Sequence, residues 1–240
     1  MALESLSVLA IDTAIDACSV AICIEKKIID TRFKKMLRGQ SEALLPMIID
    51  IFNAADCDYS DFNCVAVTRG PGSFTGVRIG LATAHGIALA SKILCVGATT
   101  LEILAFQALE ESSRRSPVLV AIDTKRESFF CQIFSEDGHE LLSPQIAVLE
   151  NVPKLVQKIG LTGKSIITAG HSANRIFQEL NNQGCFCINA MNLPCPDASW
   201  LAKLTVKKWQ NSELNIDAKF PEPLYLRYPD ITPSPADVRA

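Results

Sequence analysis

The chain has 240 residues, a formal net charge of −3 and 48% hydrophobic residues. This length and hydrophobic content exclude an intrinsically disordered chain and favour one large domain or two small ones. No apolar run is long enough to cross a membrane, and the first seven residues lack the basic start and apolar core of a signal peptide. We therefore expect a cytoplasmic protein. The slightly acidic balance argues against a surface that binds polyanions over its whole extent.

The first 55 residues predict an antiparallel meander followed by a helix. The expected strands cover residues 7–13, 18–24 and 27–33. Ser41 is a suitable N-cap for a helix that ends near Ala55, although Pro46 favours a start near Leu45. Apolar side chains cover an arc of about 200° on this helix, whereas a helix lying on one sheet needs little more than 100°. They are Leu44, Leu45, Met47, Ile48, Ile49, Ile51 and Phe52. We therefore expect a second buried face.

Residues 68–90 combine a turn signal with a helix of small side chains. After a strand over residues 64–68 and the turn Gly70-Pro71-Gly72, small residues recur at every fourth position. This small-residue ridge consists of Gly72, Gly76, Gly80, Ala84 and Ala88. Such a ridge lets another backbone approach closely, and because glycine costs a helix about 1 kcal/mol relative to alanine, close packing has to compensate. Arg78, His85 and Lys92 share one narrow edge of the same helix.

A repeat divides the chain into two halves. Residues 120–124 read VAIDT and echo residues 9–13, which read LAIDT, and both copies continue into an alternating strand, a turn and a third short strand. The polar stretch SSRRSP over residues 112–117 predicts the boundary between the halves. We therefore expect a duplicated α/β protein. Its predicted parts are an N-terminal lobe over residues 1–112, a C-terminal lobe over residues 113–228 and a loose tail over residues 229–240.

The remaining elements alternate between strands and helices. Thr99 is expected to cap a helix that ends near Ser112, with Glu102 completing a capping box. The other expected elements are strands over residues 93–96, 165–169 and 185–189 and helices over residues 152–159, from 172 or 174 to 180, and 198–209.

Several kinds of catalytic site fit the motifs poorly. GPGSFTG matches neither a P-loop nor G-x-G-x-x-G, although a helix N-terminus with Ser73 and Thr75 could still hold an anion. Ser73 lies outside a G-x-S-x-G nucleophile motif and is better explained as a helix N-cap. His85, His139 and His171 are far apart and lack metal-ligand spacing. Most of the nine cysteines lie in apolar runs without a C-x-x-C pair, so we expect buried thiols rather than a metal site.

Asp12 and Asp123 end two buried strands at equivalent places of the repeat. Together with Thr13 they could line a nucleotide cleft, or the carboxylates could instead cap turns. A fold that binds nucleotide between two such strands would follow each of them with glycine, but Ala14 and Lys125 stand in these places. This difference weakens nucleotide cleavage as an activity, and we regard the cleft as degenerate.

Basic residues gather between residues 26 and 38. They are Lys26, Lys27, Arg32, Lys34, Lys35 and Arg38, partly offset by Glu25 and Asp30. A solvated strand edge, protected by lysine from aggregation, is one interpretation. A minor contribution to an RNA surface is the other.

Five strings in the sequence resemble the TsaB (YeaZ) family of bacterial tRNA threonylcarbamoyladenosine biosynthesis proteins. They are AIDTA at 10–14, LLPM at 44–47, RGPGSFTGVRIG at 69–80, VAID at 120–123 and YLR at 225–227. The GPGSFTGVRIG string is highly specific, and the matches span nearly the whole chain. The resemblance implies the α/β ASKHA (actin, Hsp70 and sugar kinase) fold, with two duplicated lobes that each contain a mixed sheet and flanking helices.

The resemblance also implies a role and partners. It implies a non-catalytic paralogue of TsaD, the subunit that transfers threonylcarbamoyl to adenosine next to the anticodon of tRNA. Such a protein binds TsaD through two helices of its N-terminal lobe, the ATPase TsaE joins this pair, and the isolated chain forms a homodimer through the same surface. ATP or ADP and a metal ion then belong to the partner subunits, tRNA is contacted at most indirectly, and no membrane is involved. The histidine often found just before the first helix is Gln40 here.

The residue pattern and the resemblance together predict a scaffold with no activity of its own. The predicted partner interface consists of Leu44, Leu45, Ile48, Phe52, Gly72, Gly76, Arg78, Gly80 and Ala84. Two alternatives are a stand-alone ASKHA small-molecule kinase or ATPase, which needs glycine-rich loops after Asp12 and Asp123, and a metallopeptidase-like protein, which needs a metal or a nucleophile.

Overall fold

An antiparallel meander opens each half of the chain, whose computed structural model describes residues 6–214 and 220–227. The first meander consists of β1 (Val8–Asp12), β2 (Ala17–Ile24) and β3 (Lys27–Lys35), and the second of β6 (Val118–Arg126), β7 (Ser128–Phe134) and β8 (Glu140–Ala147). Every residue of β1 is buried, and β6 is buried over its first five residues. The two copies of the predicted repeat therefore lie on β1 and β6, each of which is the central strand of its own sheet.

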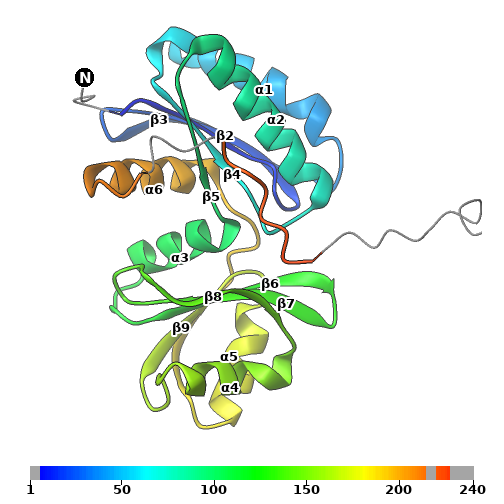
Figure 1. Ribbon diagram of the computed structural model, residues 1–240, viewed down its shortest axis with the longest axis vertical. Coiled ribbons are helices and arrows are strands. Elements are labelled where there is room, and N and C mark those ends of the chain that lie inside the picture. Colours follow the sequence, from blue (N-terminus) through cyan, green and yellow to red (C-terminus); the bar gives the residue numbers. More distant parts are fainter. Residues whose placement is uncertain (1–5, 215–219, 228–240) are drawn as a thin grey trace, which may run out of the picture.

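Each sheet is completed by two parallel strands, β4 (Cys64–Thr68) and β5 (Leu94–Ala98) in the first, β9 (Ser165–Ala169) and β10 (Phe186–Met191) in the second. The strand orders are β3-β2-β1-β4-β5 and β8-β7-β6-β9-β10. In both sheets the first pairs are antiparallel and the last pairs are parallel. The two sheets thus have the same topology, which confirms the prediction of two duplicated α/β lobes with mixed sheets (Figure 1).

Four helices cover the two faces of the first sheet. The helices α1 (Gln40–Ala55) and α2 (Phe74–Ser91) lie side by side on one face, where they share a core with β1 and β4 (Figure 1). The helices α3 (Thr100–Glu111) and α6 (Ala198–Gln210) cover the other face. The opposite side of α3 packs through Leu101 and Leu104 on the second sheet, so this helix forms the layer between the lobes.

Two shorter helices, α4 (Val152–Lys158) and α5 (Ala173–Asn182), cover the far face of the second sheet. Single 3₁₀ turns precede β4 and α4, at Tyr59–Asp61 and Leu149–Asn151. Thr99 and Glu102 form the predicted capping box at the start of α3. Within the described residues, no helix is both long and apolar enough to span a membrane.

The start of α1 differs from the prediction. The helix begins at Gln40 rather than near Leu45, and Ser41 lies inside it instead of capping it. Gly39 is the residue before the helix and has a φ of 91°, which glycine adopts without strain. Pro46 lies inside the helix on its exposed side. The carbonyl group that loses a partner because of Pro46 therefore faces water, which limits the cost of the missing hydrogen bond.

The last part of the chain returns to the first lobe. Helix α6 packs on the first sheet through Leu201 and Ala202. Residues 220–227 lie along α2 and β5, where the Leu224 N–H donates to the Arg69 carbonyl at 2.7 Å. The prediction of a C-terminal lobe over residues 113–228 did not include this crossing, which depends on tertiary packing. The predicted tail over residues 229–240 lies outside the described residues.

Candidate functional site

The small-residue ridge of α2 faces the chain's own first sheet. Gly76, Gly80, Ala84 and Ala88 are all buried. Side chains at Gly72 and Gly76 would overlap the carbonyl oxygens of Ala14 and Thr13 at the end of β1.

A Cβ at Gly80 would lie 2.7 Å from the Thr13 hydroxyl oxygen. This hydroxyl donates a hydrogen bond to the Gly76 carbonyl at 2.6 Å. The backbone that the ridge admits is therefore that of Thr13 and Ala14, directly after β1 of the same chain.

This packing corrects the predicted interface residue by residue. Gly76, Gly80 and Ala84 are unavailable to a partner, and the same holds for Leu44, Ile48 and Phe52 on α1, which are at most 6% exposed. Gly72 is exposed but packs against Ala14. The other predicted interface residues that are exposed are Leu45 and Arg78. Sequence periodicity located the two helices but did not assign which of their sides meets the sheet.

A second row of small residues lies on the opposite side of α2. Ala82, Gly86 and Ala90 are exposed and also recur at every fourth position. A Cβ at Gly86 would meet no atom within 4 Å. On this side Leu89 is 72% exposed. This row is therefore open to another helix, unlike the small-residue ridge.

Helix α1 adds two large apolar side chains next to this row. Leu45 is 51% exposed and Ile49 is 57% exposed. Asp50 lies on the flank of α1 that faces β3, because its carboxylate binds Arg32 there. At 100° per residue, Leu45 and Ile49 lie on the other flank, which faces α2.

We call the set Leu45, Ile49, Ala82, Gly86 and Leu89 the outer face. Its members Leu45 and Ile49 belong to the excess apolar arc that the sequence indicated on α1.

The cleft between the lobes has a volume of about 380 Å³. It is lined on one side by Asp16 and the start of α2, and on the other by Asp123, Lys125 and Arg227. The Lys125 ammonium group spans it to the Asp16 carboxylate at 2.9 Å. The Asp123 carboxylate accepts a hydrogen bond from the Lys125 N–H at 2.7 Å, which is the turn-capping role weighed from the sequence.

Asp12 and Thr13 are separated from this cleft. Both are buried, at 0% and 1% exposure, behind the start of α2. Burial raises the pKa of Asp12 to about 7, against the opposing effects of the Thr68 hydroxyl and the Ala14 N–H. The structure therefore does not bring Asp12 and Thr13 together with Asp123 at one accessible site.

The other candidate residues have structural surroundings. Ser73 caps α2, with its hydroxyl accepting a hydrogen bond from the Gly76 N–H at 3.3 Å. His85, His139 and His171 lie on α2, before β8 and before α5, respectively. Across residues 6–214 and 220–227, no group of three or more His, Cys, Asp and Glu side chains is arranged to hold a metal ion.

The polar edge of α2 holds residues 220–227, which we call the C-terminal strap. Arg78 donates to the Tyr225 hydroxyl at 2.9 Å and lies 3.7 Å above the Phe74 ring. The His85 ring packs against Phe220 in a tilted arrangement, with ring centroids 4.7 Å apart. Arg78 is thus occupied within the chain, and the strap occupies the flank of α2 opposite α1.

Comparisons with known proteins place these features in a family. The sequence profile of the family described as "TsaD: tRNA N6-adenosine threonylcarbamoyltransferase" matches residues 34–205. The tRNA threonylcarbamoyladenosine biosynthesis protein TsaB of Haemophilus influenzae is 29% identical over 94% of this chain and 95% of its own length. YeaZ from Pseudomonas aeruginosa has a TM-score of 0.71 and 26% identity over 92% of this chain and 100% of that chain.

The chain belongs to the TsaB (YeaZ) branch of the TsaD family.

The match to TsaB of Escherichia coli is closer in identity but shorter. It reaches 37% over 130 residues, which is 54% of this chain and 55% of that relative. A ROK hexokinase from Thermus thermophilus has a TM-score of 0.52 at 11% identity, and this likeness concerns the fold alone. Together with the duplicated sheets, these similarities confirm the ASKHA fold that the resemblance implied.

Two features of this TsaB-family chain were missed from the sequence. The outer row of Ala82, Gly86 and Ala90 could have been found by testing every fourth-residue register of α2 rather than one. The strap contacts of Tyr225 and Phe220 join residues more than a hundred positions apart, for which one sequence gives no signal.

Proposed function

We propose that the chain is a non-catalytic subunit of the machinery that makes threonylcarbamoyladenosine in tRNA, and that it supports a TsaD protein by binding it through the outer face. The observation that carries the proposal is the outer face itself. Two neighbouring helices expose Leu45, Ile49 and Leu89 beside a row of small residues. Exposed apolar side chains that cluster in this way are typical of protein interfaces.

The row of small residues gives this face a specific kind of partner. Without side chains at Gly86 or large ones at Ala82, a second helix could approach the backbone of α2 closely. Leu45 and Ile49 would then pack beside the incoming helix. A pair of helices of the same family fold satisfies this geometry best, so the partner is a TsaD protein in the complex and a second copy when the chain is alone.

The cleft offers little support for chemistry by this chain. Asp12 is sealed behind α2, and the Lys125 ammonium group occupies part of the opening through its ion pair with Asp16. In a scaffold protein, neither the Asp12 carboxyl group nor the Lys125 ammonium group has to contact a substrate. Nucleotide, the metal ion and the TsaE ATPase are accordingly assigned to the rest of the complex, and tRNA chemistry to TsaD.

The test compares binding of purified variants to TsaD from the same organism. Gly86→Leu places a large side chain on the row, at a position where an added Cβ would meet no atom within 4 Å, and Ile49→Glu adds a charge on the adjacent flank. Both should lower the affinity for TsaD at least tenfold while circular dichroism stays unchanged. In a tRNA modification assay, the variants that bind TsaD more weakly should also support less threonylcarbamoyladenosine formation than the unaltered chain.

A matched control separates the outer face from general surface effects. Leu141 is a large apolar side chain with 42% exposure on β8, in the other lobe. Leu141→Glu should bind TsaD as well as the unaltered chain does. If Gly86→Leu and Ile49→Glu also bind normally, the outer face is not the docking surface. Threonylcarbamoyladenosine formation that is independent of this chain would contradict the proposed function itself.

A further inference from the structure

Positive charge is concentrated in one segment of an acidic protein. Residues 26–38 contain six basic residues and one acidic residue, whereas the whole chain has 23 basic and 26 acidic residues. The rest of the chain therefore carries 17 basic and 25 acidic residues. This difference in charge between a short segment and the rest of the chain favours a local binding site for polyanions, even though the net charge is −3.

The fold places this segment on one border of the molecule. Strand β3 is the outermost strand of the first sheet and is nine residues long, which corresponds to about 30 Å. Lys26 directly precedes the strand, Lys27 begins it, and Lys34 and Lys35 end it. Figure 1 shows this strand at the side of the first lobe, next to α1. The charges thus follow a line rather than one point.

Most of these cations are free to meet a ligand. The side chains of the basic strip, which we define as Lys26, Lys27, Lys34, Lys35 and Arg38, are all exposed. Within residues 6–214 and 220–227, none of them forms an ion pair with a carboxylate. Long unpaired lysines are the side chains that bind phosphate groups by charge.

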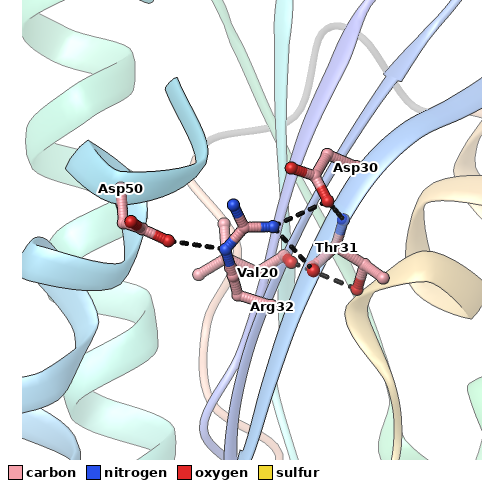
Figure 2. A network of polar contacts seen from close by, with 5 residues as sticks. All are labelled: Val20, Asp30, Thr31, Arg32 and Asp50. Carbon is pink, nitrogen blue, oxygen red and sulfur yellow. Dashed lines mark hydrogen bonds and ion pairs between the residues drawn. The ribbon is translucent and has the colours of Figure 1, made fainter. Parts of the chain in front are cut away.

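Arg32 differs because the chain already neutralises it. Its Nη1 atom lies 2.7 Å from the Asp30 carboxylate, and its Nε atom lies 2.6 Å from the Asp50 carboxylate (Figure 2). The contact with Asp50 links β3 to α1. Asp50 follows Ile49 of the outer face, so the basic strip and the outer face lie on opposite flanks of the same helix.

Protection against aggregation does not explain the whole strip. A few lysines already discourage another strand from pairing with an exposed edge, and the register shift between Ile22 and Cys23 disturbs the β2–β3 pairing as well. Phe33 is 46% exposed on β3, and because side chains alternate along a strand it lies on the same face as Lys35. An exposed aromatic ring beside cations is typical of surfaces on which nucleic-acid bases stack. These features favour RNA over an added peptide strand.

We propose that the basic strip binds the phosphate backbone of the tRNA that is being modified. This inference rests on the proposed function, because that function supplies tRNA as the polyanion. Five cations along about 30 Å can each oppose a phosphate group and release its counterions. The strip would orient the tRNA without reading its sequence, since phosphate contacts carry no sequence information.

The test measures binding of a fluorescent, unmodified tRNA transcript to the purified full-length chain at several salt concentrations. With five phosphate contacts, the logarithm of the association constant should fall with the logarithm of the salt concentration with a slope of about −4. The test variant replaces three strip lysines by glutamine, and a control variant makes the same charge change in the other lobe. The test positions are Lys27, Lys34 and Lys35, and the control positions, which are also exposed, are Lys154, Lys158 and Lys164.

The test variant should bind tRNA roughly tenfold more weakly or worse, with a slope less negative by about 2, and the control variant should bind as the unaltered chain does. Equal affinities for the two variants would overturn the proposal. So would equal competition by poly-glutamate and by unlabelled tRNA, since the strip would then be a site for acidic peptides.

Binding of the same variants to TsaD separates this inference from the proposed function. The test variant keeps an intact outer face and should bind TsaD normally. If TsaD binds but all variants bind tRNA alike, only the basic strip is refuted. If TsaD does not bind the unaltered chain, the proposed function fails, and the contrast between test and control variants still decides whether the strip binds RNA.

Discussion

Replacing Asp12 with Asn should change how the stability of the protein depends on pH. Asp12 is completely buried at the end of β1. Its Oδ1 atom accepts a long hydrogen bond of 3.4 Å from the Ala14 N–H, and its Oδ2 atom has no hydrogen-bond partner within the described residues. Burial raises the pKa of this carboxyl group from 3.8 to about 7. Asn keeps the size of the side chain and removes the ionisable group.

The sign and size of the effect follow from that pKa. Between pH 3.8 and about 7 the folded chain keeps a proton on Asp12 that the unfolded chain has released. The free energy of unfolding therefore falls as the pH rises through this window and levels off above it. One pKa unit is worth about 1.4 kcal/mol, so the whole loss is about 4 kcal/mol. Asp30 and Glu102 have lowered pKa values, and their stabilising effects are complete above about pH 4.5.

Urea unfolding of the unaltered chain and of Asp12→Asn at several pH values measures the effect. The two proteins should have similar free energies of unfolding near pH 4. The variant should become more stable than the unaltered chain as the pH rises to 7, by up to about 4 kcal/mol. If the difference between them is the same at every pH, the buried carboxyl group does not titrate as its surroundings indicate, and the reasoning is refuted.

Three further predictions concern the packing of the first lobe. Gly76→Ala should lower the free energy of unfolding by about 1–3 kcal/mol or more, because the new methyl group would overlap the Thr13 carbonyl oxygen. Gly86→Ala should instead raise the free energy of unfolding by up to about 1 kcal/mol, because alanine favours a helix more than glycine does and the position is open. Thermal unfolding of the two variants compares these effects. Thr99→Ala should cost about 1 kcal/mol in urea unfolding, since it removes the cap of α3, and an unchanged midpoint would contradict the capping role. Tyr225→Ala removes its hydrogen bond with Arg78 and should speed amide hydrogen exchange in the C-terminal strap without changing the rate in β1; equal protection in both proteins would show that the strap is held elsewhere.

The candidate site could be predicted only in part. The excess apolar arc over residues 44–52 predicted a second buried face on α1, whereas Leu45 and Ile49 are exposed within this chain. The small-residue ridge was located in the sequence but assigned to a partner, whereas it contacts Thr13 and Ala14 of the same chain. Spacing specifies that small side chains share one side of a helix. It does not specify whether the backbone that approaches them belongs to the same chain.

The sequence by itself determined the elements, the duplication and the family. The periodicity of buried residues and the cap at Thr99 depend on near neighbours in the chain, and the VAIDT repeat can be found by comparing the sequence with itself. Tertiary structure alone decided which side of α2 is exposed, that Asp12 is sealed from the cleft, and that α6 and the strap return to the first lobe. These properties arise from contacts between distant residues, such as Thr13 with Gly76 and Arg78 with Tyr225, whose energies depend on the complete packed fold.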